Sequence, residues 1–201
     1  MIRALRGAML CFLSALLAGA CGGARSTPGA TASASSALRG VRVDPPTRTT
    51  DFALADQTGQ IVRLSKQRGK YVILTFLYTH CPDVCPLIAS NLNQALRQLG
   101  SQRSNVRVIA VSVDPRRDSQ AAVVRFVALH HLLPQFHYLT GSRADLAPIW
   151  RAYHVTVTPE GKSIGHSAYE MLIDPSGRGR LIYDAQVRAA DVIHDIRVLE
   201  N

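Results

Sequence analysis

The pattern of apolar and polar residues alternates between strand and helix periodicities from Asp51 onward. Continuous apolar runs and period-two runs predict strands, and apolar residues recurring every three or four positions predict helices. The predicted strands cover residues 52–54, 61–64, 71–77, 106–113, 136–139, 168–173 and 180–183. The predicted helices cover about 84–99, 118–131, 142–153 and 187–199.

The order of these elements predicts an α/β domain. Residues 71–77 are almost entirely apolar, as expected for a strand at the centre of a sheet that is covered on both faces. Two strand–helix–strand units precede an antiparallel hairpin and a last helix, which matches the thioredoxin-like fold. We expect a central mixed β-sheet flanked by helices, with the strands at 52–54 and 61–64 as an N-terminal hairpin extension. Chemistry in such sheets lies beyond the carboxyl ends of the strands, so the segment after Leu77 is the place for a site.

The first residues predict an export signal. Arg3 and Arg6 precede an apolar run at 8–20, which is shorter than the roughly 20 residues of a membrane-spanning helix. Small residues lead into Cys21, as in a bacterial lipoprotein signal, although Leu17 lies one position further back than usual. We therefore predict a lipoprotein-type signal peptide at 1–21, with Cys21 lipidated. Plain secretion and an uncleaved anchor are the alternatives.

The next segment, 22–47, is rich in Gly, Ala, Ser and Thr and has few large apolar residues. Such a composition cannot bury enough surface to offset its ordering entropy, so it predicts a flexible tether. The thioredoxin-like domain is then expected at 48–201. The expected location is outside the cytoplasm, anchored to a membrane through the lipidated cysteine, with the domain facing the periplasm.

The charge balance narrows the class of partner. The chain has 23 basic and 14 acidic residues, and loss of Arg3 and Arg6 with the signal leaves 21 against 14, a formal charge of +7. The basic residues are dispersed, and no nucleic-acid-binding motif is present, so we expect no nucleic-acid partner. Attraction to acidic protein surfaces or anionic lipid is favoured over nucleic acid, and a solvated basic surface without a specific role is favoured over both.

Cys81 and Cys85 are the only cysteines outside the predicted export signal at 1–21. Pro86 lacks an N–H and is tolerated only in the first turn of a helix, so the helix begins close to Asp83, a natural N-cap residue. Cys85 then lies in the first turn and Cys81 on the loop before it. Unpaired N–H groups and the helix dipole favour the thiolate at both positions.

The Cys-x-x-x-Cys spacing permits either a disulfide or a metal site. Two thiolates alone do not complete a four-coordinate zinc site, whereas a soft ion of low coordination, Cu(I), suits two thiolates and one imidazole. Of the seven histidines, His166 is the candidate, because it follows the predicted loop 158–165, which approaches the first main helix in a thioredoxin fold. On the residues alone, a ligand and an ordinary loop histidine both remain open.

Three blocks of sequence resemble the Sco/SenC family of copper chaperones. They are Tyr-Thr-His-Cys-Pro-Asp-Val-Cys-Pro at 78–86, Val-Ser-Val-Asp-Pro-Arg-Arg-Asp at 111–118, and His-Ser at 166–167 followed by Leu-Ile-Asp-Pro-Ser-Gly at 172–177. The resemblance spans about 51–201. The chain departs from it at Gly165, where many relatives carry Asp, which leaves the copper affinity and the preference for Cu(II) open.

The resemblance implies one copper ion, Cu(I) with Cu(II) as the second state, bound by Cys81, Cys85 and His166. It also implies delivery of copper to the dinuclear copper centre of cytochrome c oxidase. The implied partners are the oxidase subunit that carries this centre, a periplasmic copper donor or thiol reductant, and a membrane through the lipid anchor.

Two other functions remain open. Cys81 and Cys85 can act as the redox pair of a thiol–disulfide oxidoreductase that keeps partner cysteines reduced, with copper secondary. In that case the protein has enzymatic activity, which the chaperone function does not require. The third hypothesis is a binding module in which a Cys81–Cys85 disulfide is a structural staple. A peroxidase is disfavoured because no separate resolving cysteine is present.

Overall fold

The computed structural model describes residues 37–160 and 163–200. The predicted signal peptide, the lipidation site at Cys21 and most of the predicted tether lie outside the described residues. Within the described ranges, no helix has the length and apolar character needed to cross a membrane.

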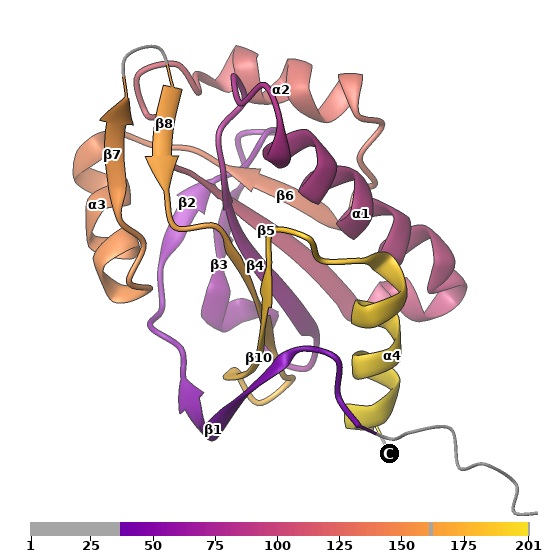
Figure 1. The fold of residues 1–201 in the computed structure, drawn as a ribbon. Helices are drawn as coiled ribbons and strands as arrows, with labels where there is room; N and C mark the ends of the chain where they lie inside the picture. Colours follow the sequence, from indigo (N-terminus) through magenta and orange to yellow (C-terminus); the bar gives the residue numbers. More distant parts are fainter. Residues whose placement is uncertain (1–36, 161–162, 201) are drawn as a thin grey trace, which may run out of the picture. The chain divides into compact units, whose positions relative to one another are not determined.

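The core of the domain is a six-stranded mixed sheet in the order β1-β10-β9-β4-β5-β6 (Figure 1). The central strands β4, β5 and β6 are parallel, and β9, β10 and β1 extend the sheet antiparallel from β4. This confirms the predicted thioredoxin-like class and its mixed sheet. The strands of this sheet are β1 Val41–Arg48, β4 Tyr71–Leu77, β5 Val106–Ser112, β6 Phe136–Leu139, β9 Tyr169–Ile173 and β10 Arg178–Asp184.

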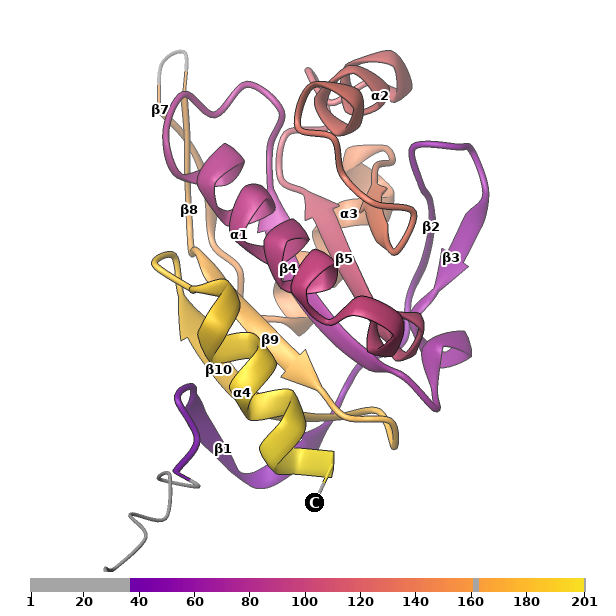
Figure 2. The same ribbon diagram turned by 90° about the vertical axis from the view of Figure 1, so that its right-hand side faces the viewer.

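Helices cover both faces of the sheet, which is why every residue of β4 is buried. Helices α1 (Val84–Gln98) and α4 (Ala189–Glu200) pack side by side on one face, and α3 (Arg143–Ala152) lies on the other (Figure 2). On the α3 face, the ring of Phe76 lies 6.0 Å from that of Tyr153 at the end of α3. Helix α2 (Gln120–Leu129) begins after the Ser119 side chain, which accepts a hydrogen bond from the N–H of Ala122.

The predicted N-terminal hairpin protects the β6 edge of the sheet. It consists of β2 (Ala53–Ala55) and β3 (Ile61–Arg63), and a short 3-10 helix at Leu64–Gln67 follows. The side-chain amide of Gln57 forms hydrogen bonds with β6 like those of a neighbouring strand. It donates to the carbonyl of Phe136 at 2.9 Å and accepts from the N–H of Tyr138 at 2.8 Å. An unpaired strand edge is a template for aggregation, and this contact removes part of it.

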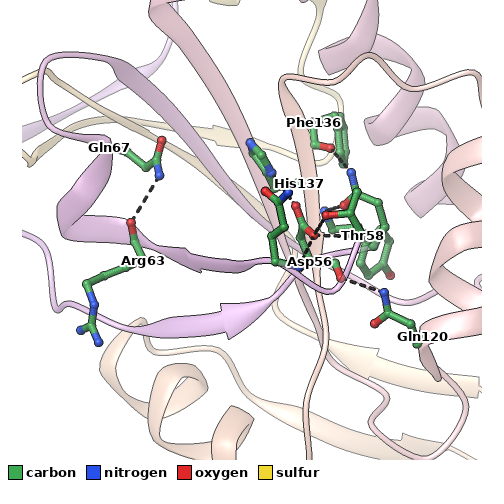
Figure 3. Close-up of polar contacts among 10 residues, drawn as sticks. Asp56, Thr58, Arg63, Gln67, Gln120, Phe136 and His137 are labelled. Carbon is green, nitrogen blue, oxygen red and sulfur yellow. Dashed lines mark hydrogen bonds and ion pairs between the residues drawn. The ribbon is translucent and has the colours of Figure 1, made fainter.

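Asp56 fixes the turn of this hairpin (Figure 3). Its carboxylate accepts from the N–H and hydroxyl of Thr58 at 2.8 and 2.6 Å, and it pairs with His137 Nδ1 on β6 at 3.0 Å. Its carbonyl accepts from the side chain of Gln120 on α2. Burial favours the protonated acid, but the bonds from Thr58 and His137 outweigh it and lower the pKa of Asp56.

The sheet begins earlier in the chain than composition predicts. Strand β1 occupies residues 41–48, so it lies mostly inside the range 22–47 predicted as a tether. Its side chains are mainly exposed, and it is held through its backbone, which pairs antiparallel with β10. The buried carboxylate of Asp195 on α4 also accepts from the N–H groups of Arg39 and Gly40, both at 2.8 Å. Backbone pairing of this kind leaves little trace in the apolar pattern.

Candidate metal centre

The loop between β4 and α1 carries the two cysteines. Helix α1 begins at Val84, as predicted from Pro86, and Asp83 occupies the N-cap position without a side-chain capping bond. The sulfur of Cys81 takes the capping role instead, because it accepts the N–H of Cys85 at 3.4 Å. The first-turn N–H groups of a helix have no partner within the helix, so the geometry directs them at this sulfur.

The two sulfurs lie beside each other as free thiols and have opposite acid–base properties. The Cys85 thiol donates toward Cys81, and this bond, with the N–H groups of Asp83 and Cys85 and the Tyr78 hydroxyl, outweighs burial and lowers the pKa of Cys81 to about 5. The same contact and burial raise the pKa of Cys85 far above its usual value. The prediction of a favoured thiolate is therefore right for Cys81 and wrong for Cys85. Cys85 is fully buried and shares its proton with the neighbouring thiolate, and this outweighs the helix N-terminus.

Asp118, in the turn after the neighbouring strand β5, holds the cysteine loop. Its carboxylate accepts from the N–H of Thr79 at 2.9 Å, from the Thr79 hydroxyl at 2.7 Å and from the Ser112 hydroxyl at 2.6 Å. It is 1% exposed, and burial raises its pKa. The sequence places Asp118 only at the turn between β5 and α2. Its contact with Thr79 follows from β4 and β5 being adjacent parallel strands whose carboxyl ends meet.

The segment predicted as a loop at 158–165 forms a β-hairpin, and His166 is the last residue of its second strand. Strands β7 (Val157–Glu160) and β8 (Ser163–His166) pair antiparallel, with Val157 opposite His166. Pro159 and Gly165 disfavour strand structure, so the sequence pattern does not reveal the hairpin. The Nδ1–H of His166 donates to the carbonyl of Ser167 at 3.0 Å. Since a carbonyl can only accept, Nε2 keeps a free lone pair. Burial lowers the pKa of His166, so the imidazole is neutral at pH 7.

Tyr78 lies between the imidazole and the sulfurs. Its ring is edge-on to that of His166 with the centroids 5.9 Å apart, and its hydroxyl approaches Cys81 and the N–H of Ile164 on β8. Burial, and then the approach to Cys81, raises the pKa of Tyr78. The sequence carries no signal for this role of Tyr78, because an aromatic residue at the end of a buried strand is typical of a core position.

The structure thus brings the two sulfurs together and places the imidazole one aromatic ring away. Across the described ranges, no three His, Cys, Asp or Glu side chains are grouped closely enough to hold a metal ion. The other histidines of the folded part have separate environments. His137 pairs with Asp56, and His194 Nε2 lies 3.1 Å from the carbonyl of Ala37, while His80 and His154 are exposed.

The fold and this site define a thioredoxin-like protein with a thiol pair at the corner between a central strand and its helix. A family model described as SCO1/SenC matches residues 42–200, and the chain belongs to this family.

Curated relatives and solved structures agree with this assignment. The mitochondrial SCO2 homologue of Bos taurus is 35% identical over 153 residues, which are 72% of this chain and 56% of that protein. Copper-bound ScoI of Bradyrhizobium japonicum shares 28% identity with a TM-score of 0.66, over 77% of this chain and 99% of that one. Apo Sco1 of Thermus thermophilus shares 32% identity with a TM-score of 0.71, over 83% and 99%. The chain thus spans just over half the length of its bovine relative.

Proposed function

We propose that this protein is a copper chaperone that binds one Cu(I) through Cys81, Cys85 and His166 and delivers it to the dinuclear copper centre of cytochrome c oxidase. Its family and the copper-bound relative from Bradyrhizobium japonicum support the proposal. The observation that carries it is the thiol pair itself. One sulfur is already a thiolate, and the other is in contact with it, with a neutral imidazole one aromatic ring away.

The donor set fits a soft monovalent ion. Thiolates and imidazoles bind Cu(I) well, and a three-coordinate ion stays open to an incoming ligand. Cys81 offers its thiolate directly, while Cys85 loses its proton when the ion binds, so binding releases a proton. His166 would offer Nε2 as the third donor, since its Nδ1–H is bound to the carbonyl of Ser167.

Competition with a chromophoric Cu(I) chelator under anaerobic conditions tests this function. The reduced protein should bind one Cu(I) per chain. Cys81→Ser and Cys85→Ser should each weaken binding by roughly a hundredfold or more, and His166→Ala by roughly ten- to a hundredfold. His154→Ala is the matched control, because His154 is exposed and lies outside the proposed ligand set. Binding that is unchanged in both cysteine variants would refute the proposal.

The acid–base split of the cysteines also favours thiol–disulfide exchange as a second candidate. An accessible thiolate attacks a partner disulfide, and a buried thiol then resolves the mixed disulfide. His166→Ala separates the two functions. Copper delivery should collapse in this variant, whereas reduction of a model disulfide should continue at close to the wild-type rate.

We also propose that the chain is exported and held at a membrane by a lipid on Cys21, so that the domain works in the periplasm. The pattern of residues 1–21 supports this. Metabolic labelling with palmitate should mark the wild-type chain and leave Cys21→Ser unmarked. Equal labelling of the two chains would refute the lipid anchor.

A further inference from the structure

A groove opens directly beside the more accessible of the two sulfurs. It has a volume of about 430 Å3 and runs from the cysteine loop, at His80 and Cys81, along the space between the start of α1 and helix α2. Arg125, Phe126, Leu129 and His130 form its α2 side. Cys81 is half-buried and Cys85 fully buried, so a molecule in this groove meets the Cys81 thiolate first.

The groove is apolar and has a fixed shape. The Phe126 ring packs at 4.4 Å from that of His130 and at 5.4 Å from that of Tyr138, which holds it in place. Leu129 lines the groove and is 73% exposed. An exposed leucine at this position offers a partner an apolar contact close to the sulfur.

The charge of the groove indicates what it accepts. Arg125 supplies a fixed positive charge, His80 and His130 add polar ring nitrogens, and no carboxylate is among the groove residues. Asp83, the nearest exposed acid in the cysteine loop, is not one of them, and Asp118 is buried beneath the loop. The groove therefore carries a fixed positive charge at Arg125 with no carboxylate among its residues, and complementary charge steers and selects partners.

We propose that this groove docks an extended segment of a partner protein in which a thiol or other metal-binding residue is flanked by apolar and acidic side chains. The apolar residues pack on Phe126 and Leu129, an acidic residue pairs with Arg125, and the thiol is presented to Cys81. The identity of the partner as a copper acceptor or donor rests on the proposed function. The docking itself is testable on the metal-free protein.

The test uses three synthetic peptides whose cysteine is activated as a disulfide with 2-thiopyridine. Their sequences are Asp-Leu-Cys-Leu-Asp, Lys-Leu-Cys-Leu-Lys and Asp-Ser-Cys-Ser-Asp. The Cys81 thiolate attacks the peptide sulfur, a mixed disulfide forms, and the pyridine thiolate leaves and takes a proton. Cys81 is oxidised and the activated disulfide is reduced. Release of the thione gives the rate constant at pH 8, where Cys81 is fully ionised.

The acidic leucine peptide should react about tenfold faster than the basic one at low ionic strength, and salt should reduce the ratio. Arg125→Glu should bring the ratio close to one. Arg103→Glu is the matched control, because it makes the same change of charge beyond the far end of α1, and it should keep the wild-type ratio. The leucine peptide should also react several-fold faster than the serine peptide, and Leu129→Ser should remove this advantage.

Equal rates for the acidic and basic peptides would overturn the proposal, as would a ratio that Arg125→Glu leaves unchanged. So would a dimer of the wild-type protein that Leu129→Ser converts to a monomer, since a second copy would then fill the groove. These outcomes are independent of the copper titration. A protein that binds Cu(I) but shows no peptide preference keeps the chaperone function and loses the docking site.

Discussion

At the scale of single residues, the site depends on the different environments of two cysteines, Cys81 and Cys85. Cys81 receives first-turn N–H groups and is half-buried, while Cys85 is fully buried and donates to its neighbour. Only one thiolate therefore exists at neutral pH before a partner arrives. The pair therefore has one nucleophilic thiolate, at Cys81, and one remaining thiol proton, at Cys85.

The pH dependence of Cys81 alkylation tests this asymmetry. The rate with iodoacetamide should be half-maximal at about pH 5 and level off above it, because the thiolate is the reactive species. Cys85→Ala removes the main donor to Cys81 and should move the midpoint upward by at least about one pH unit, whereas Cys85→Ser keeps a donor and should move it less. A wild-type midpoint near 9 would show that Cys81 is an ordinary thiol.

A second prediction for a single residue concerns Glu170 on β9. Its side chain is fully buried, and burial raises its pKa to about 8. One carboxyl oxygen accepts from the Thr75 hydroxyl at 3.3 Å, and the other has no hydrogen-bond partner in the described structure. The unfolded chain ionises near pH 4.5, so the free energy of unfolding should fall as the pH rises from about 4.5 to 8. The loss is on the order of a few kcal/mol.

Urea unfolding at pH 5, 7 and 9 measures this effect. Glu170→Gln should flatten the decline between pH 5 and 8, because it removes the ionisable group. Glu200→Gln, a change at an exposed position, serves as the control and should follow the wild-type curve. Parallel curves for wild type and Glu170→Gln would show that this carboxyl does not ionise differently on folding.

At the scale of elements, the cysteine loop is fixed by Asp118, in the turn after β5, rather than by its own helix cap. Asp118→Ala leaves the Thr79 N–H and the Ser112 hydroxyl without an acceptor. The free energy of unfolding should fall by roughly 2–4 kcal/mol, and the Thr79 amide should lose protection from hydrogen exchange. Asp118→Asn keeps an acceptor oxygen and should keep most of this protection. If the Thr79 amide exchanges at the same rate in Asp118→Ala and Asp118→Asn, the bond from Thr79 to Asp118 does not hold the loop.

Most elements were predictable because their apolar periodicity is strong. The buried strands β4 and β5, the start of α1 at Val84 and the Ser142 cap of α3 all lie where the pattern places them. The pattern did not reveal β1, which is held mainly through backbone pairing, or the β7–β8 hairpin, which pairs antiparallel and buries Ile164. Their side chains are largely exposed or include Pro and Gly, so periodicity carries no information about them.

At the scale of the whole molecule, the parallel strands bring distant segments to one end of the sheet. The cysteine loop after β4 and the Asp118 turn after β5 meet there, and the β7–β8 hairpin lies at the same end in Figure 1. The sequence identified the three candidate ligands at 81, 85 and 166, since two follow the central strand and the third follows from the family resemblance. It did not identify Tyr78, because no sequence pattern states which aromatic ring lies between two loops.

The most direct test of the account is X-ray absorption spectroscopy of the protein loaded with one Cu(I). The account predicts two sulfur ligands and one nitrogen ligand, with the nitrogen lost in His166→Ala and kept in His154→Ala. A wild-type spectrum with sulfur ligands alone, unchanged by His166→Ala, would show that the β7–β8 hairpin contributes nothing to the metal centre and would contradict the account.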